Sequence, residues 1–239
     1  MSFWGYYEYE TIAAKAARAA KQLEALKKKN PDICPIIIEG RTIARSWWGR
    51  AWTKNLEIYA DYANRIGRGR SYVKNGFVID LKIKEMSVSA LVCGSSSTPY
   101  KVTIGIKALP NERLNSLAKL CHHKINGMEE LVEGKFPKDL AELFTQKEQG
   151  LFPSNKEIEF GCSCPDGAYM CKHVSAVLYA IGAKFDTDPT LFFKLRGIDF
   201  KLFLAKTVES KMSSMLKNAG KHTKRVMSDQ DAAKLFGIS

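Results

Sequence analysis

The sequence predicts an α+β fold: an antiparallel three-stranded or larger sheet covered by helices, plus a small ββα-like finger and C-terminal helices. Three consecutive segments between residues 77 and 106 alternate apolar and polar residues, a pattern typical of strands with one buried face. Most other segments have the 3.6-residue spacing of amphipathic helices. One short stretch, CSCPDGAYMCKH, collects three cysteines and a histidine, and it predicts a metal site.

Composition favours a globular protein inside the cell. The chain has 239 residues, of which 45% are hydrophobic and 26% charged, values that are ordinary for a globular domain. No apolar run is long enough to span a bilayer, and the N-terminus MSFWGYYEYE lacks the basic-then-apolar order of a signal peptide. We therefore expect a cytoplasmic protein without a membrane partner, in which cysteines stay reduced.

The positive charge is unevenly distributed along the chain. The net charge is +12, and residues 1–110 carry 18 Lys or Arg against 9 Asp or Glu, whereas residues 111–170 carry 7 against 10. A basic surface can be solvated without binding anything, but this separation of charge in a chain with a pI of about 9.4 favours a polyanionic partner. We expect nucleic acid, DNA more than RNA, and no small-molecule substrate.

The N-terminal half divides into a basic segment and an α+β domain. Residues 1–38 form a basic helix or tail, in which an Ala-, Lys- and Leu-rich helix ends at Asn30 before a proline. Residues 39–150 form the α+β domain. Its first helix, SWWGRAWTKNLE, has Ser46 as a possible N-cap and places Trp48 and Trp52 on one face. We expect that helix to cover the sheet, with its tryptophans in the core and not on a stacking platform.

The strands and the later elements follow in order. FVIDLKIK, SVSALVCG and YKVTIGIK, separated by short turns, predict an antiparallel meander. Short helices follow Pro110. Residues 151–190 hold the finger, with a strand at EIEFG before the cluster and a helix at HVSAVLYAIGAKF after it. Residues 191–239 are expected to form a C-terminal helical segment and a basic tail.

The cluster has the spacing of a zinc site. Residues two apart on a strand face the same way, so Cys162 and Cys164 can reach one ion. The Pro-Asp-Gly sequence that follows favours a turn. We place Cys171 just before the next helix and His173 in its first turn. Three thiolates and an imidazole fill the tetrahedral coordination of Zn²⁺ and leave no open position, so the sequence predicts one structural zinc.

Other interpretations of the cluster fit less well. A disulfide conflicts with a reducing compartment and leaves one of the three cysteines over. An iron–sulfur centre held by three cysteines and a histidine remains an alternative. A catalytic dyad of Cys171 and His173 leaves Cys162 and Cys164 without a role.

The stretch CSCPDGAYMCKHVSAVLYAIG resembles a SWIM zinc finger, whose pattern is Cys-x-Cys, a variable spacer, Cys-x-His and an apolar helix. The segment from SWWGRAWTKNLE through YKVTI is also similar to the N-terminal part of bacterial SWIM-finger proteins. Such proteins are commonly encoded beside Swi/Snf-type helicase-like ATPases. The resemblance implies binding of nucleic acid or of protein partners, with such an ATPase as a possible partner.

One segment is the strongest local candidate for nucleic-acid binding. NRIGRGRSYVKNG has the character of a glycine-punctuated loop, in which arginines could contact phosphates and a tyrosine could stack on an unpaired base. A hairpin connection has the same appearance. Lys172 adds a charge beside the helix N-terminus of the finger. The candidate contact residues are Arg65, Arg68, Arg70, Tyr72, Lys74 and Lys172.

Two functions of different classes remain open. One is a zinc-stabilised accessory protein that binds nucleic acid. The other is an interaction scaffold that docks on a Swi/Snf-type ATPase and touches nucleic acid little. We do not expect an enzyme, because the sequence shows no nucleophile, carboxylate pair or phosphate-binding glycine loop.

Overall fold

The computed structural model describes residues 10–58, 63–121, 128–135, 137–206 and 212. Its elements are, in chain order, α1 (Ile12–Lys29), α2 (Trp47–Glu57), α3 (Ala63–Lys74), β1 (Val78–Lys84), β2 (Ser87–Val92), β3 (Tyr100–Ile106), α4 (Asn111–Cys121), α5 (Met128–Glu133), α6 (Lys138–Thr145), the 3₁₀ turn η1 (Asn155–Glu157), β4 (Ile158–Cys162), α7 (Lys172–Thr187) and α8 (Thr190–Leu195). Residues 200–206 are also helical. The predicted basic tail lies almost entirely outside these residues.

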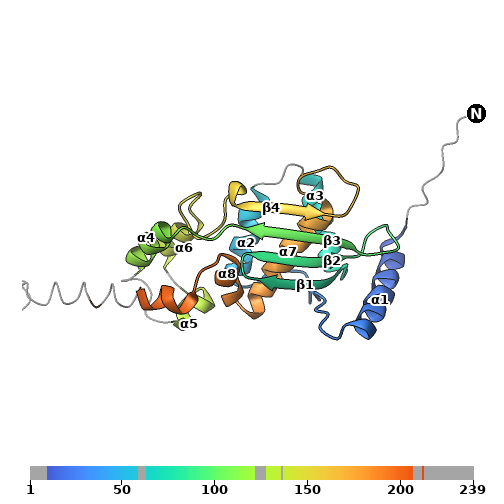
Figure 1. The fold of residues 1–239 in the computed structure, drawn as a ribbon, viewed down its shortest axis with the longest axis horizontal. Coiled ribbons are helices and arrows are strands. Elements are labelled where there is room, and N and C mark those ends of the chain that lie inside the picture. Colours follow the sequence, from blue (N-terminus) through green and yellow to red (C-terminus); the bar gives the residue numbers. More distant parts are fainter. Residues whose placement is uncertain (1–9, 59–62, 122–127, 136, 207–211, 213–239) are drawn as a thin grey trace, which may run out of the picture.

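The four strands form one antiparallel sheet in the order β1-β2-β3-β4 (Figure 1). In its register Leu81 pairs with Ala90, and Ala90 pairs with Val102, so buried side chains share one face. The predicted α+β class and antiparallel sheet are confirmed. The finger is built into this sheet, because β4, which leads to the cysteines, pairs with β3.

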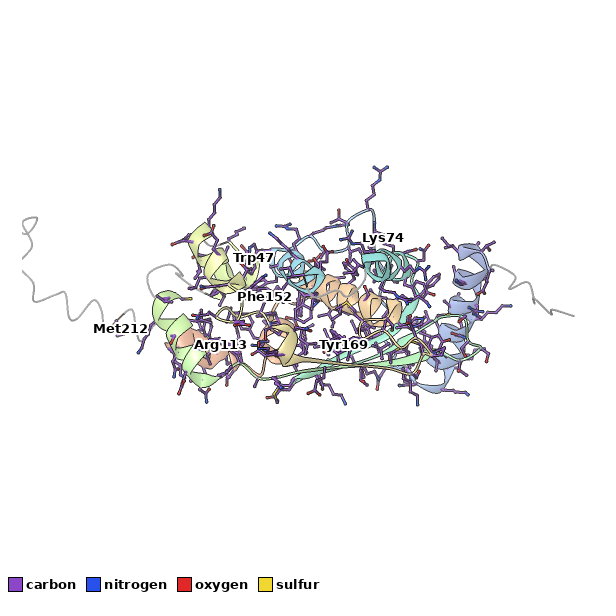
Figure 2. The ribbon with its side chains drawn as sticks, turned by 90° about the horizontal axis from the view of Figure 1, so that it is seen from above. Trp47, Lys74, Arg113, Phe152, Tyr169 and Met212 are labelled. Carbon is purple, nitrogen blue, oxygen red and sulfur yellow. The ribbon has the colours of Figure 1, made fainter. Side chains whose placement is uncertain are left out.

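Three layers make up the body of the molecule. Seen from above, α7 lies between the sheet and the pair α2 and α3 (Figure 2). Helix α7 contacts all four strands on one side and packs against α2 and α3 on the other. The expectation that the tryptophan helix covers the sheet is therefore wrong. The more uniformly apolar α7 can bury both of its sides, whereas α2 is exposed at Arg50 and Lys54.

Glycines let α2 and α3 approach α7 closely. A Cβ atom at Gly49 of α2 would lie 2.5 Å from the carbonyl oxygen of Gly182 in α7. A Cβ atom at Gly69 of α3 would lie 2.3 Å from Ser175 Oγ and 2.9 Å from the carbonyl carbon of Ser175. Real Cβ atoms do not come so close, so both helix crossings require glycine.

The tryptophans of α2 belong to the core, as the sequence predicted. Trp48 and Trp52 are fully buried, and their indole N–H groups donate to the carbonyl oxygens of Leu131 and Leu178, each at 2.9 Å. The ring of Trp48 packs among four phenylalanines, Phe144, Phe152, Phe192 and Phe193. A buried tryptophan with its N–H satisfied contributes area to the core and offers no stacking surface.

Helix α1 lies at one end of the sheet, beside the loop between β2 and β3 (Figure 1). Its buried residue is Ala19, and two polar side chains attach it to the loop. Arg18 donates to the carbonyl oxygen of Gly94, and Gln22 donates to that of Ser97 at 2.6 Å. The lysines of α1 therefore stay at a fixed place beside the sheet.

A buried ion pair connects η1, the turn before β4, to the end of α8. Arg196 is fully buried and donates to the carbonyl oxygens of Leu151 and Lys107, at 2.9 and 2.6 Å. Its remaining nitrogen lies 3.3 Å from the carboxylate of Glu157. Burial alone would raise the pKa of Glu157, but the Ser154 N–H and the charge of Arg196 outweigh it and lower the pKa.

No helix among the described elements is both long and apolar enough to cross a membrane.

Candidate metal centre

The structure brings the four predicted ligands together. The Sγ atoms of Cys162, Cys164 and Cys171 and a ring nitrogen of His173 all lie within 4.8 Å of one another. Nδ1 of His173 is 3.9 Å from the Sγ atoms of both Cys162 and Cys171. Ligand atoms of a tetrahedral zinc site stand about 3.8 Å apart, given Zn–S bonds of about 2.3 Å. The donor set and its spacing therefore fit Zn²⁺.

The end of β4 and the start of α7 position three of the four ligands. Cys162 is the last residue of β4 and pairs with Val102 of β3. Cys171 is the N-cap of α7, and its Sγ accepts from the backbone N–H of Val174 at 3.5 Å. His173 lies in the first turn of α7, as the sequence predicted. The metal would thus link the edge strand of the sheet to the helix that covers the sheet.

The imidazole of His173 is fixed by two tyrosines. Tyr100 lies against the ring with a centroid distance of 4.5 Å, and Tyr72 meets it edge-on at 5.5 Å. The His173 side chain is buried, and Nε2 has no hydrogen-bond partner in the described structure. This packing orients Nδ1 toward the cysteines, so Nδ1 is the atom that would bind the metal.

The three thiols influence one another's protonation. A hydrogen bond from Cys162 is the main cause that lowers the pKa of Cys171 to about 3, with further help from His173 and the Val174 N–H. The same hydrogen bond, followed by burial, raises the pKa of Cys162, and burial raises that of Cys164. Cys171 therefore loses its proton readily, whereas Cys162 and Cys164 do not. A bound dication would remove this cost and hold all three as thiolates.

An ion pair fastens the spacer between the cysteines to α3. Asp166 accepts from the backbone N–H of Ala168 at 3.2 Å, and it faces Arg65 with a nitrogen–oxygen distance of 2.7 Å. Tyr169 donates to the carbonyl oxygen of Ile158 at 2.9 Å and so ties the end of the spacer to β4. The role of Asp166 is not predictable from the sequence, because the Pro-Asp-Gly stretch indicates only a turn.

The predicted arginine loop is wrong as a piece of structure, because residues 63–74 form helix α3. The glycines that suggested a flexible loop face different surroundings: Gly67 is exposed, and Gly69 lies against α7. Arg65 is paired with Asp166. Arg70 donates to the Tyr179 hydroxyl at 2.7 Å and pairs with Glu57.

Tyr72 is also unavailable for stacking on a base. It is 8% exposed and packs between Phe77 and His173, and burial raises its pKa to about 12. Arg68 and Lys74 remain exposed on α3, and Lys172 is half-buried in the first turn of α7. Figure 2 shows Lys74 on the helical side of the molecule, away from the sheet. Nucleic-acid contacts by these three cations stay a prediction.

Comparison with known proteins identifies the metal centre. The family model of the SWIM zinc finger matches residues 161–182. This range holds Cys162, Cys164, Cys171 and His173 together with α7 as far as Gly182. Residues 161–182 are a SWIM zinc finger. The finger and its ligand cluster fit a single structural Zn²⁺.

A longer similarity extends beyond the SWIM finger. Uncharacterized protein Rv2102 of Mycobacterium tuberculosis is 35% identical over 164 residues, which is 68% of this chain and 59% of that protein. The chain thus matches less than two thirds of the relative's length. No solved structure matches the chain significantly.

Proposed function

We propose that this protein is a non-catalytic accessory module that binds nucleic acid, DNA more than RNA, with zinc as a structural element. The observation that carries the proposal is a set of exposed lysines on α1. Lys21, Lys27, Lys28 and Lys29 make no ion pair with the acidic side chains that the structure describes. Unpaired lysines on a helix with a fixed position are suited to phosphate contacts.

The last turn of α1 adds to this surface. Lys27, Lys28 and Lys29 end the helix, where its dipole favours positive charge. Arg18, in contrast, is engaged with Gly94 and with Glu10, whose carboxylate lies 2.9 Å away. Arg18 therefore anchors the helix, and the lysines remain for a ligand.

The zinc centre supports a structural role for the metal. Four protein ligands complete the coordination that zinc prefers, which leaves no position for water or substrate. Cys171 and His173 are each 1% exposed, so the inner side of the site is closed by the core. A closed site stabilises a fold and does not activate a nucleophile.

Salt dependence of binding tests the proposal. Zinc-loaded protein would be titrated with labelled DNA and with RNA of the same sequence at several salt concentrations, with fluorescence anisotropy as the readout. Replacing Lys27, Lys28 and Lys29 with Gln should reduce the slope of log affinity against log salt. The reduction should be about 0.7 to 0.9 for each phosphate that the variant no longer neutralises, or about two to three units for all three lysines.

The result for the unmodified protein decides between the two functions. Binding that weakens steeply with salt and changes little between sequences supports nucleic-acid binding. Absence of measurable binding at low salt contradicts it. The scaffold function, with a Swi/Snf-type ATPase as the partner that the resemblance implies, would then be preferred.

A further inference from the structure

We infer that the outer face of the sheet is the surface on which nucleic acid lies, and that it holds the phosphate backbone without reading bases. This inference rests on the proposed function and names its surface. The outer face is the side of the sheet opposite α7.

No described helix or strand covers the outer face, and the segment around Cys34 lies only against its β1 edge. Figure 1 shows the strands in front of the helical layers, and Figure 2 shows α7 and the α2–α3 pair on one side of the sheet alone. The strand register identifies the residues that point outward, because they pair with one another across the strands. They are Asp80, Lys82, Lys84, Ser87, Ser89, Leu91, Lys101, Thr103, Gly105, Glu159 and Gly161.

The charge of this face is positive. Lys82, Lys84 and Lys101 form no ion pair with any described residue. Of the two acids, Asp80 is 7% exposed and its carboxylate accepts from the backbone N–H of Cys34 at 2.9 Å. Glu159 is exposed on the edge strand β4. Three free lysines against one exposed acid make the face complementary to a polyanion.

The middle of the face is smooth. The register places Lys82 beside Ser89, and Ser89 beside Thr103, which in turn pairs with Gly161. Small side chains let a phosphate backbone approach the sheet closely, and the hydroxyl groups can donate hydrogen bonds to phosphate oxygens. No outward position of the four strands is aromatic. The face therefore offers no stacking platform, and binding should not depend on base sequence.

Helix α1 continues the same basic surface. It lies at the end of the sheet where β3 begins, and Gln22 binds the carbonyl oxygen of Ser97, four residues before Lys101 (Figure 1). Helix α1, which carries lysines of its own, therefore stands at this end of the sheet. A nucleic acid lying along the strands toward α1 would meet both groups of lysines.

The test compares two triple variants of the full, zinc-loaded chain with equal loss of charge. One carries Lys82→Gln, Lys84→Gln and Lys101→Gln on the outer face. The control carries Lys54→Gln, Lys138→Gln and Lys147→Gln, three exposed lysines of the helical side. Thermal unfolding would first establish that both triple variants fold. Anisotropy titrations against salt then use a labelled duplex and its single strand, each in unrelated sequences.

The outer-face variant should lose about two to three units of the salt slope, equally for all sequences, while the control stays within about one unit of the unmodified protein. Equal slopes for the two variants, or a loss that depends on base sequence, would overturn the inference. A reduced slope in the Lys27, Lys28 and Lys29 variant alone would also overturn it but leave the proposed function standing. Failure of the unmodified protein to bind would refute the proposed function itself.

Discussion

Two glycines of α3, two residues apart, should respond oppositely to the same substitution. Nothing lies within 4 Å of a Cβ atom built on Gly67, whereas one built on Gly69 would lie 2.3 Å from Ser175 Oγ. Both residues have ordinary helical backbone angles. Gly67→Ala should therefore stabilise the protein, and Gly69→Ala should destabilise it.

The magnitudes follow from helix propensity and packing. Alanine is better than glycine in a helix interior by about 1 kcal/mol, and Gly67→Ala should gain most of that. Gly69→Ala gains the same propensity but overpacks the crossing with α7, which costs about 1 to 3 kcal/mol. The hydroxyl of Ser175 can rotate away, but its backbone carbonyl carbon, 2.9 Å from the new Cβ, cannot. We therefore expect the upper half of that range, and a net loss of about 1 to 2 kcal/mol.

Urea unfolding of the zinc-loaded protein measures both effects, provided that the m-value is unchanged. The wild type is the reference, and the double variant shows whether the two effects add. A Gly69→Ala protein as stable as the wild type would refute the close α3–α7 contact. A destabilised Gly67→Ala protein would contradict the assignment of residues 63–74 to a helix.

Three further outcomes are expected. Purified protein should hold one zinc per chain by elemental analysis, and Cys171→Ser should lose it and open the spacer to proteolysis; iron, or no metal, would contradict the site. Glu157→Gln should lower the free energy of unfolding by about 3 kcal/mol near neutral pH, because it leaves buried Arg196 without its counter-charge. Folding lowers the pKa of Glu157, so the stability difference between the wild type and Glu157→Gln should be present above pH 4.5, the ordinary pKa of the group. It should disappear as the pH falls through the lowered pKa. A stability difference independent of pH would refute the electrostatic origin. The chain alone should show no nucleotide hydrolysis or nuclease activity, and turnover that co-purifies with it and vanishes in Cys162→Ser would overturn this.

The elements that could be predicted are those with a local signal. Alternation of apolar residues indicated β1, β2 and β3, and the cysteine spacing with its turn indicated where Cys171 and His173 sit relative to α7. Ligand geometry follows from such short-range patterns because all four residues lie within twelve positions. The metal centre was therefore easier to predict than its surroundings.

The remaining features depend on contacts between distant segments. Residues 63–74 look like a loop because glycine is rare inside helices. What requires Gly69 there is Ser175, more than a hundred positions later. Tyr100 and Tyr72, which enclose His173, come from β3 and α3, and no spacing rule joins them to the cluster. The layer order is likewise tertiary, because several helices are apolar enough to cover a sheet.

The arrangement around β4 explains why the finger and the domain act as one structure. Strand β4 is one of the two edge strands of the sheet, and its backbone pairs with a neighbouring strand on one side only. Polar clusters hold it at both ends. Glu157, immediately before the strand, binds Arg196 in the core, and Cys162, its last residue, belongs to the metal centre. Both clusters connect β4 to the helices packed on the sheet. Loss of metal should therefore release β4 from its Cys162 end, while the Arg196 pair still holds the other end against β3.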